Sequence, residues 1–307
     1  MSKIAFIYPG QGAQKIGMGK DFYENGTLAK EVYDKANEVL DFDIKEICFE
    51  ENDKLDRTDY TQAALVTTCL AITAEIENMG IKPDVTAGLS LGEYAAIATA
   101  GGMTNEDAIK TVRKRGIFMN EAVPTGEGTM AAILGLTGEE VYEVVKDRED
   151  VSIANYNCPG QIVITGKKQA VLDAAAALTE AGAKRAIELN VSGPFHSPFL
   201  KGAGEKLGQE LKKVEMKELT VPYVTNVTAN YVSDVSETKE LLKNQVSSSV
   251  MWEQSVIKMI DEGVDTFIEI GPGRTLAGFI RKINRDVKVI NIGTYEELSS
   301  LKEKIEN

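Results

Sequence analysis

The sequence predicts an α/β protein with a large domain built on a mainly parallel sheet and a smaller domain inserted into it. Two observations lead to this prediction. Short apolar runs typical of buried strands alternate with helix-like stretches along the chain, as in a parallel sheet covered by helices. Between residues 126 and 194 the order becomes strand, helix, strand, strand, helix, strand, which is the ferredoxin-like βαββαβ pattern.

The first part of the large domain alternates strands with helices. The elements expected from apolar periodicity are strands at 4–8 and 85–87 and helices at 28–40, at 61–79, from 91 onward and at 106–122. The first strand ends in Pro9-Gly10-Gln11-Gly12. Asn105 is expected to cap the helix at 106–122, and Pro124-Thr125-Gly126 then breaks the chain.

The inserted domain is expected to span 126–194, so that the large domain comprises 1–125 and 195–307. The elements expected inside it are strands at 129–134, 151–155, 161–165 and 184–189 and helices at 138–146 and 167–181. The large domain then resumes with strands near Tyr223 and at 266–270, and it ends in a charged helix.

The composition is that of a globular protein with an acidic surface. The net charge of −13 and a pI of about 4.8 argue against nucleic acid or an anionic membrane as the partner. The apolar stretch 63–74 contains three threonines and ends at Glu75, so it is expected to be a buried helix rather than a membrane span. The N-terminal apolar run is too short for a secretory signal. Three widely spaced cysteines without a Cys-x-x-Cys pair fit reduced thiols in a cytoplasmic protein, not a disulfide framework or a metal site.

One Gly-x-Ser-x-Gly run, Gly88-Leu89-Ser90-Leu91-Gly92, lies between an expected strand and an expected helix. A serine at such a corner projects its hydroxyl outward, above the helix N-terminus, and can act as a nucleophile. The alternative is a glycine-rich turn that happens to hold a serine.

A serine nucleophile needs a base that is neutral near pH 7, and the chain has a single histidine, His196. It lies in Ser192-Gly193-Pro194-Phe195-His196-Ser197-Pro198, where glycine and two prolines stiffen the loop. A buried histidine bonded to backbone is the alternative, but the pairing with Ser90 favours a catalytic role.

Two backbone amides can complete such a site. The Gln11 amide, in the glycine-rich turn after the first strand, and the Leu91 amide, just after the serine, can form a two-donor oxyanion hole. A tight turn that binds nothing is the alternative.

Arg115 falls on the apolar face of its helix. Ala108, Val112, Met119 and Ala122 recur at helical spacing, and Arg115 lies within their stripe. A guanidinium facing the core requires an anionic or carbonyl partner, because an unpaired buried charge is costly. The two interpretations are an ion pair with a buried carboxylate and a clamp for a substrate carboxylate.

Other polar residues are assigned to structure. Gln62 is expected to cap its helix, with a place in the pocket as the alternative. Asn155, Asn157 and Gln161 are expected to stabilise the turn between two strands. The run from Glu269 to Arg274 is interpreted as a strand, a turn and a helix start rather than a phosphate site.

Five motifs, in order along nearly the whole chain, resemble the signatures of the malonyl-CoA:acyl-carrier-protein transacylase family of bacterial fatty acid synthesis. They are Tyr8-Pro9-Gly10-Gln11-Gly12, Gly88-Leu89-Ser90-Leu91-Gly92-Glu93-Tyr94, Arg113-Lys114-Arg115-Gly116, Gly193-Pro194-Phe195-His196-Ser197 and Glu269-Ile270-Gly271-Pro272-Gly273. The resemblance implies an α/β-hydrolase-like core in the large domain.

The resemblance also implies a role for each matched residue. The implied roles are nucleophile for Ser90, base for His196, oxyanion-hole amides for Gln11 and Leu91, malonyl-carboxylate binding for Arg115 and a histidine-orienting carbonyl for Gln245. Phe195 resembles the form of its motif that selects malonyl over methylmalonyl. Leu89 departs from the family, which usually has histidine there, and activity is expected to survive that change.

The implied reaction is a ping-pong transfer from malonyl-CoA to acyl carrier protein by a monomeric enzyme, without a metal or bound cofactor. Because carrier proteins are acidic, a locally basic docking face is expected around the small domain. The candidate residues are Lys167, Lys168, Lys184, Arg185 and Lys201. For each of them the alternative is an ordinary solvated surface charge. Three other functions stay open: a serine esterase or thioesterase of the α/β-hydrolase type, an acyltransferase that loads a polyketide carrier, and a carrier-binding scaffold without chemistry.

Overall fold

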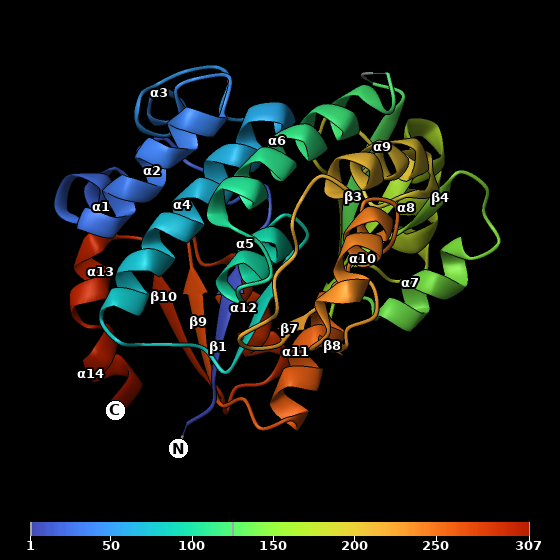
Figure 1. Cartoon of the computed structure of the whole chain (residues 1–307). Helices are drawn as coiled ribbons and strands as arrows, with labels where there is room; N and C mark the ends of the chain where they lie inside the picture. The colour runs from blue at the N-terminus through green and yellow to red at the C-terminus, as the bar shows by residue number, and fades with distance from the viewer. Residues whose placement is uncertain (1, 125, 307) are drawn as a thin grey trace.

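The computed structural model describes residues 2–124 and 126–306, and two β-sheets organise it (Figure 1). The larger sheet has the strand order β10-β9-β1-β2-β7-β8, and every neighbouring pair is parallel except β7 and β8. Its strands are Ile4–Tyr8 (β1), Val85–Gly88 (β2), Tyr223–Val224 (β7), Tyr231–Val232 (β8), Thr266–Ile270 (β9) and Lys288–Ile292 (β10). The predicted mainly parallel sheet is confirmed.

The smaller sheet is formed by four antiparallel strands in the order β4-β5-β3-β6. Its elements are Gly128–Leu134 (β3), Gly138–Val145 (α7), Val151–Cys158 (β4), Gln161–Lys167 (β5), Lys168–Glu180 (α8) and Arg185–Glu188 (β6). The element order is the one predicted. Strand β4 runs three residues further than expected, so Asn157 and Cys158 belong to the strand rather than to a turn. The predicted break before this unit includes Thr125, which lies outside the described residues.

Helices cover the larger sheet and connect its strands. They are Lys20–Asn25 (α1), Thr27–Val39 (α2), Ile44–Phe49 (α3), Thr58–Asn78 (α4), Gly92–Thr99 (α5), Asn105–Glu121 (α6), Lys201–Leu211 (α9), Thr238–Gln245 (α10), Trp252–Asp261 (α11), Thr275–Ile283 (α12), Tyr295–Ser299 (α13) and Leu301–Glu306 (α14), with 3-10 turns at Pro198–Leu200 and Val235–Glu237.

Three helix predictions are corrected. Helix α4 begins at Thr58, three residues before the predicted start. Asn105 is the first residue of α6 rather than its cap, because Thr104 Oγ1 accepts the Asp107 N–H at 3.0 Å. The expected charged C-terminal helix consists of two short helices, α13 and α14, after a strand, β10, that the sequence did not reveal.

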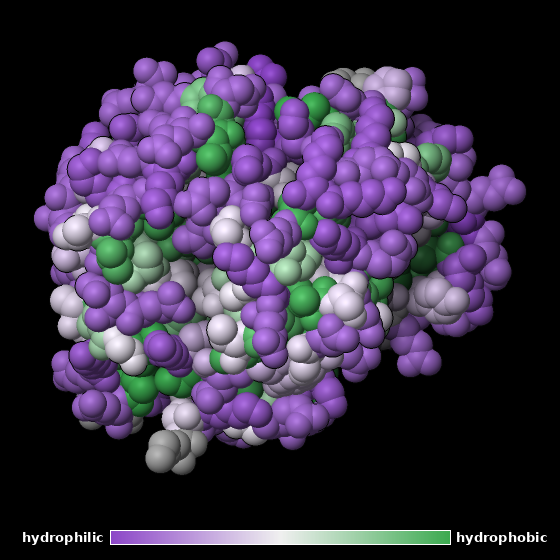
Figure 2. Space-filling model, in the orientation of Figure 1, coloured by the Kyte–Doolittle hydropathy of each residue, from purple (hydrophilic) through white to green (hydrophobic). Residues whose placement is uncertain are grey.

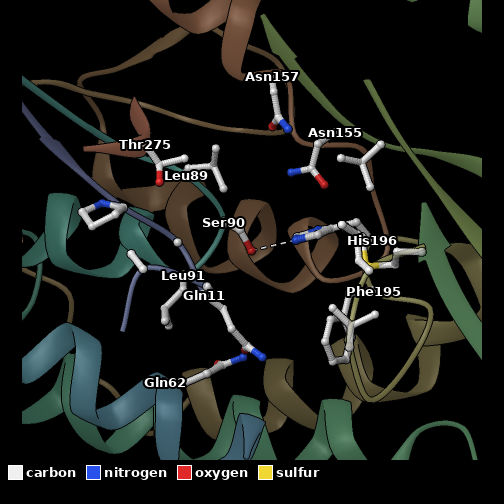
Figure 3. A pocket seen from close by; sticks show the side chains of 18 of the residues that line it. Gln11, Gln62, Leu89, Ser90, Leu91, Asn155, Asn157, Phe195, His196 and Thr275 are labelled. Atoms are coloured by element: carbon white, nitrogen blue, oxygen red, sulfur yellow. Dashed lines mark hydrogen bonds between the residues drawn. The ribbon is translucent and has the colours of Figure 1, made fainter. Parts of the chain in front are cut away.

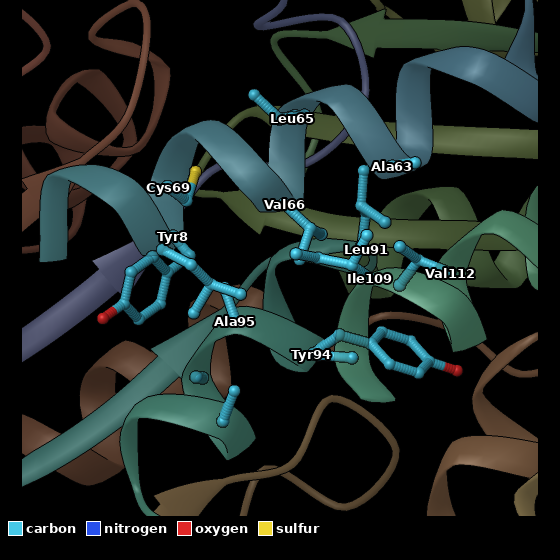
Figure 4. Close-up of a cluster of buried hydrophobic side chains, with 14 of the residues drawn as sticks. Tyr8, Ala63, Leu65, Val66, Cys69, Leu91, Tyr94, Ala95, Ile109 and Val112 are labelled. Carbon is cyan, nitrogen blue, oxygen red and sulfur yellow. The ribbon is translucent and has the colours of Figure 1, made fainter. Parts of the chain in front are cut away.

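The main core lies where α4 crosses α5 and α6 above β1. Side chains such as Val66, Cys69, Tyr94, Ala95 and Ile109 meet there (Figure 4). The apolar stretch in α4 is therefore a buried core helix, as predicted. No helix among the described residues is both long and apolar enough to cross a bilayer. On the face shown in Figure 2, hydrophilic residues dominate and apolar ones lie in small separate groups.

The two sheets are joined through β4. The Val250 N–H donates to Ala154 O at 2.7 Å, and the Tyr156 N–H donates to Val250 O at 2.9 Å. Cys158, at the end of β4, packs in one apolar cluster with Trp252 of α11 and Phe279 of α12. These contacts hold the smaller sheet beside the carboxyl ends of β1 and β2, where the candidate site lies.

Candidate active site

Ser90 stands on a strained corner between β2 and α5. Its φ is 51°, in the left-handed region that ordinary side chains disfavour. Both flanking glycines are required: a Cβ on Gly88 would overlap the backbone of Gly92, and one on Gly92 would overlap the carbonyl oxygen of Tyr8. Local sequence therefore dictates the sharp turn that exposes the serine hydroxyl.

Asn226 supports this turn from both sides. Its Oδ1 accepts the Ser90 N–H at 2.6 Å, and its Nδ2 donates to Gly88 O at 2.7 Å. No local pattern indicates this role, since Asn226 lies far along the chain in the loop after β7. Because its own N–H is engaged, Ser90 does not supply an oxyanion-hole donor.

His196 contacts Ser90 as predicted. Its Nε2 lies 2.7 Å from Ser90 Oγ (Figure 3). Its Nδ1 lies 2.9 Å from the backbone oxygen of Gln245. A carbonyl only accepts, so Nδ1 carries the proton and Nε2 is free to take the one from the serine. The position predicted for the Gln245 carbonyl is confirmed.

The environment of His196 favours the neutral imidazole. Burial, and then the positive charge of Arg115, lower its pKa to about 4. The histidine is therefore ready to accept a proton over the whole neutral range.

Arg115 is buried beside the serine. One terminal nitrogen donates to Gln62 Oε1 at 2.9 Å, and the other donates to Ser90 Oγ at 3.1 Å and to Gln245 Oε1 at 3.0 Å. All three acceptors are neutral, and among the described residues no carboxylate forms an ion pair with this guanidinium. The ion-pair interpretation is therefore wrong, and the positive charge stays available to an anion in the pocket.

Gln62 lines the pocket rather than capping a helix. It lies in the second turn of α4, whose N-cap is Arg57, and its side chain is buried. The capping prediction is wrong because α4 starts earlier than its apolar pattern indicated. The alternative, a place in the pocket, is confirmed.

The amides of Gln11 and Leu91 both border the pocket next to Ser90 (Figure 3). Neither N–H donates to another group within the described residues. The Gln11 side chain is tethered separately, with Nε2 donating to Thr58 Oγ1 at 3.0 Å. Two free donors on this side of the serine are what an oxyanion hole requires.

The pocket has a volume of about 260 Å³ and lies between the two sheets. Its lining combines the groups above with apolar walls from both sheets. The apolar members include Leu89, Met119, Met130, Val163, Leu189, Val191, Phe195 and Phe279. Leu89 thus forms part of the wall next to Ser90.

Asn155 and Asn157 also line the pocket and point into it (Figure 3). The prediction that they stabilise a turn is wrong. Strand β4 carries register shifts after Ile153 and after Tyr156. At such a bulge the alternation of side chains between the two faces of the sheet shifts by one residue. The side-chain amides of Asn155 and Asn157 therefore point away from the apolar core of the small sheet. Alternation alone could not reveal this.

The run from Glu269 to Arg274 is structural, as predicted. Glu269 accepts the N–H groups of Leu276 and Ala277 at 3.0 and 2.8 Å and so caps α12. Arg274 points to solvent and pairs with Glu297 at 2.8 Å. The three cysteines are free and buried. Among the described residues, no cluster of metal-binding side chains occurs.

The fold and this site define a class of protein, the acyl-transfer enzymes, and in this chain a backbone carbonyl, rather than an acid, contacts the histidine. Comparison with known proteins agrees. The family described as the acyl transferase domain matches residues 5–301, and the chain belongs to this family.

Relatives match over essentially their full lengths. Malonyl CoA-acyl carrier protein transacylase of Bacillus subtilis (strain 168) is 48% identical, with 100% of both chains covered, and that of Staphylococcus aureus (strain MW2) is 44% identical over 99% of each. Among solved structures, the malonyl CoA-acyl carrier protein transacylase of Clostridium perfringens is 42% identical with a TM-score of 0.96, covering 99% of this chain and 98% of that one. A malonyl-transacylase solved in complex with a type II PKS acyl-carrier protein is 34% identical with a TM-score of 0.95, covering 98% and 99%.

Proposed function

We propose that this protein transfers a malonyl group from malonyl-CoA to the phosphopantetheine thiol of an acyl carrier protein, through a malonyl ester on Ser90. The observation that carries the proposal is the Arg115 guanidinium, 3.1 Å from Ser90 Oγ and held only by neutral oxygens. A buried positive charge beside the nucleophile suits an acyl group that ends in a carboxylate.

The geometry supports a two-step exchange. His196 Nε2 takes the Ser90 proton as Oγ attacks the thioester carbonyl, and the amides of Gln11 and Leu91 receive the oxyanion. The thiol of CoA leaves with the proton from His196. The carrier thiol then gives its proton to His196 and attacks the carbonyl of the serine ester. The ester bond breaks, and Ser90 Oγ leaves with the proton from His196 as the free hydroxyl. The Gln245 carbonyl stabilises the imidazolium in both steps. The reaction uses no metal or bound cofactor.

The finer organisation belongs to the same proposal. The large domain, 1–125 and 195–307, is α/β-hydrolase-like, and the inserted domain, 126–194, is ferredoxin-like; the strand order of each sheet supports this division. The enzyme works as a monomer, since one chain supplies every group of the site. Free buried cysteines support a reducing, cytoplasmic location.

Mass spectrometry after incubation with malonyl-CoA tests the proposal. A stable malonyl adduct on Ser90 that is discharged by carrier thiol supports transfer, whereas rapid release of malonate supports the esterase alternative. In Ser90→Ala, the adduct and the transfer are both expected to vanish. Transfer that survives this substitution contradicts the role of Ser90, whereas a binding scaffold would show neither adduct nor transfer in the wild type. Carriers from fatty acid and polyketide synthesis are assayed side by side.

A further inference from the structure

Glu93 is a buried carboxyl next to the site that the mechanism above does not use. It lies in the first turn of α5, three residues after the nucleophile, and its side chain is 0% exposed. Oε2 accepts two hydrogen bonds, from Gln245 Nε2 at 2.7 Å and from the Asn226 N–H at 3.1 Å. A carboxyl this deeply buried destabilises a fold unless its contacts compensate.

Gln245 connects Glu93 to the reacting groups. Its side-chain Nε2 donates to Glu93 and to Ser90 O at 2.9 Å, while its Oε1 accepts from Arg115 at 3.0 Å. Its backbone oxygen accepts from His196. If the amide were reversed, its NH2 group would face the guanidinium, where two donors would meet. Glu93 and the Ser90 carbonyl, which both accept, therefore fix the direction of this amide.

We propose that Glu93 is a positioning residue for the acyl transfer: through Gln245 it holds Arg115 and His196, and through Asn226 it holds the Ser90 turn. The inference rests on the proposed function for the identity of the acyl group. The part that concerns Ser90 and His196 stands on their geometry alone.

The role holds in both charge states of the carboxyl. Burial raises the Glu93 pKa to about 7, with Arg115, Tyr94 and Tyr223 as the ionisable neighbours. Oε1 has no hydrogen-bond partner within the described residues, so a proton can reside there while Oε2 continues to accept. A neutral side chain that keeps an oxygen at the Oε2 position should therefore serve.

Two variants whose side chains have nearly the volume of glutamate separate the loss of the hydrogen-bond acceptor from a change in side-chain size. Glu93→Met removes both oxygens, and Glu93→Gln keeps one. The matched control is Glu75→Met, because Glu75 is another buried carboxyl that accepts a backbone N–H, that of Ala29 at 2.8 Å, in the core away from the site. Folding is monitored by circular dichroism and Tm for every variant.

The first readout is the rate at which a fluorophosphonate labels Ser90, which requires no malonyl group. We expect Glu93→Met to slow labelling about tenfold to a hundredfold, as misplaced catalytic groups do. The loss in Glu93→Gln should stay below about tenfold, because a neutral acceptor forms a hydrogen bond about half as strong. The control should label like the wild type. Equal labelling in Glu93→Met and wild type, or equal losses in the Met and Gln variants, would overturn the proposal.

The second readout is the kcat/KM ratio of malonyl-CoA to acetyl-CoA. This ratio should fall in Glu93→Met, because Arg115 loses an acceptor that is fixed in place. A merely structural defect would lower kcat/KM for both substrates alike and leave the ratio unchanged. If the wild type shows no malonyl transfer, the proposed function fails while the labelling experiment still decides the role of Glu93.

A double-variant cycle tests the path through Gln245. Glu93→Met should change the malonyl:acetyl ratio by less than about twofold in a Gln245→Met background, since linked residues act non-additively. Additive effects would refute the path. If Glu93→Met does not fold, Gln245→Met alone decides: it keeps the backbone carbonyl but removes the amide, so an unchanged ratio would overturn the proposal.

Discussion

His196 is the residue whose surroundings set the acid limit of the reaction. A base must be neutral to accept a proton, and a pKa lowered to about 4 keeps His196 neutral until the pH falls close to that value. Ser90 labelling should therefore be roughly constant between about pH 8 and about pH 5 and decline below. Removing Arg115 takes away a positive neighbour, so in Arg115→Ala the decline should begin at higher pH.

Glu93, whose pKa is raised to about 7, is the other group of this network that titrates within the pH range of the experiment. The pH profiles are therefore recorded in the Glu93→Gln background as well, where only His196 remains. A profile that declines near the ordinary histidine pKa of about 6.5 in all variants would contradict the lowered value.

Arg115 should decide which acyl group is accepted. Two charge-assisted hydrogen bonds to the malonyl carboxylate contribute ~1.5–3 kcal/mol each, so Arg115→Ala should lower kcat/KM for malonyl-CoA at least about a hundredfold. Acetyl-CoA has no carboxylate and should be used relatively better. Steady-state kinetics with both substrates measure this, with Lys114→Ala, an exposed neighbour on α6, as control. Equal losses for both acyl groups would argue against the clamp.

The sequence revealed those site residues whose signals are local. Ser90 follows from its two glycines, His196 from being the single imidazole, and Arg115 from its position on an apolar helix face. Gln62 and Asn155 were misassigned because a helix start and a β-bulge decide where they point. Glu93 and Asn226 were missed, although a carboxyl in the apolar first turn of α5 was a signal for the former. Their partners lie more than 130 residues away.

At the scale of elements, the strand-to-helix corner depends on the close approach of α5 to β1. A methyl group at Gly92 would meet the Tyr8 carbonyl, which lies in a central strand and has no room to move. Gly92→Ala should therefore destabilise the protein by about 3 kcal/mol and abolish Ser90 labelling. Thermal unfolding and the labelling assay measure the two effects.

The matched substitution is Gly202→Ala in α9, where an added Cβ meets no atom within 4 Å. There alanine should raise stability by ~0.4–1 kcal/mol through its lower chain entropy in the unfolded state. Similar Tm changes at the two positions would contradict the argument from close approach.

Strand β6 is the edge of the smaller sheet, and we propose it as the element that docks the acidic carrier. Of the five candidate cations, Lys167 pairs with Asp150 and Lys168 with Glu188. Lys184 and Arg185, at the start of β6, form no ion pair among the described residues, and neither does Lys201 at the start of α9. Reversing both, in Lys184→Glu/Arg185→Glu, should raise the KM for the acidic carrier about fivefold or more, with a smaller effect at high salt.

Malonylation of Ser90 by malonyl-CoA should be unaffected in that variant. Lys302→Glu, an exposed charge on α14, is the control for net charge. If the KM for the carrier does not change, the two cations only protect a sheet edge from pairing, which is a common role of charge there.

At the scale of the whole molecule, the order of elements could be predicted but their arrangement could not. Alternating apolar runs identified most strands, and the βαββαβ order of the smaller sheet followed from them. The position of β1 between β2 and β9 depends on pairings such as Ala5 with Val85 and Ile4 with Thr266. Nothing local encodes pairings across such sequence separations. Strands β7 and β8 are two residues each, too short for a periodic signal.

The contacts between the two sheets predict that the molecule unfolds as one unit. Both the N–H and the carbonyl oxygen of Val250 bond to β4, and Cys158 shares a core cluster with Trp252. Thr58 Oγ1 also lies 3.1 Å from Ser192 Oγ. The smaller sheet therefore cannot open without exposing apolar surface of the larger one. Calorimetry should show a single transition, and in native-state hydrogen exchange the N–H groups of Tyr156 and Val250 should be as protected as those of β1. Two separate transitions, or early exchange confined to residues 128–188, would show instead that the sheets are independent and that the pocket between them opens on its own.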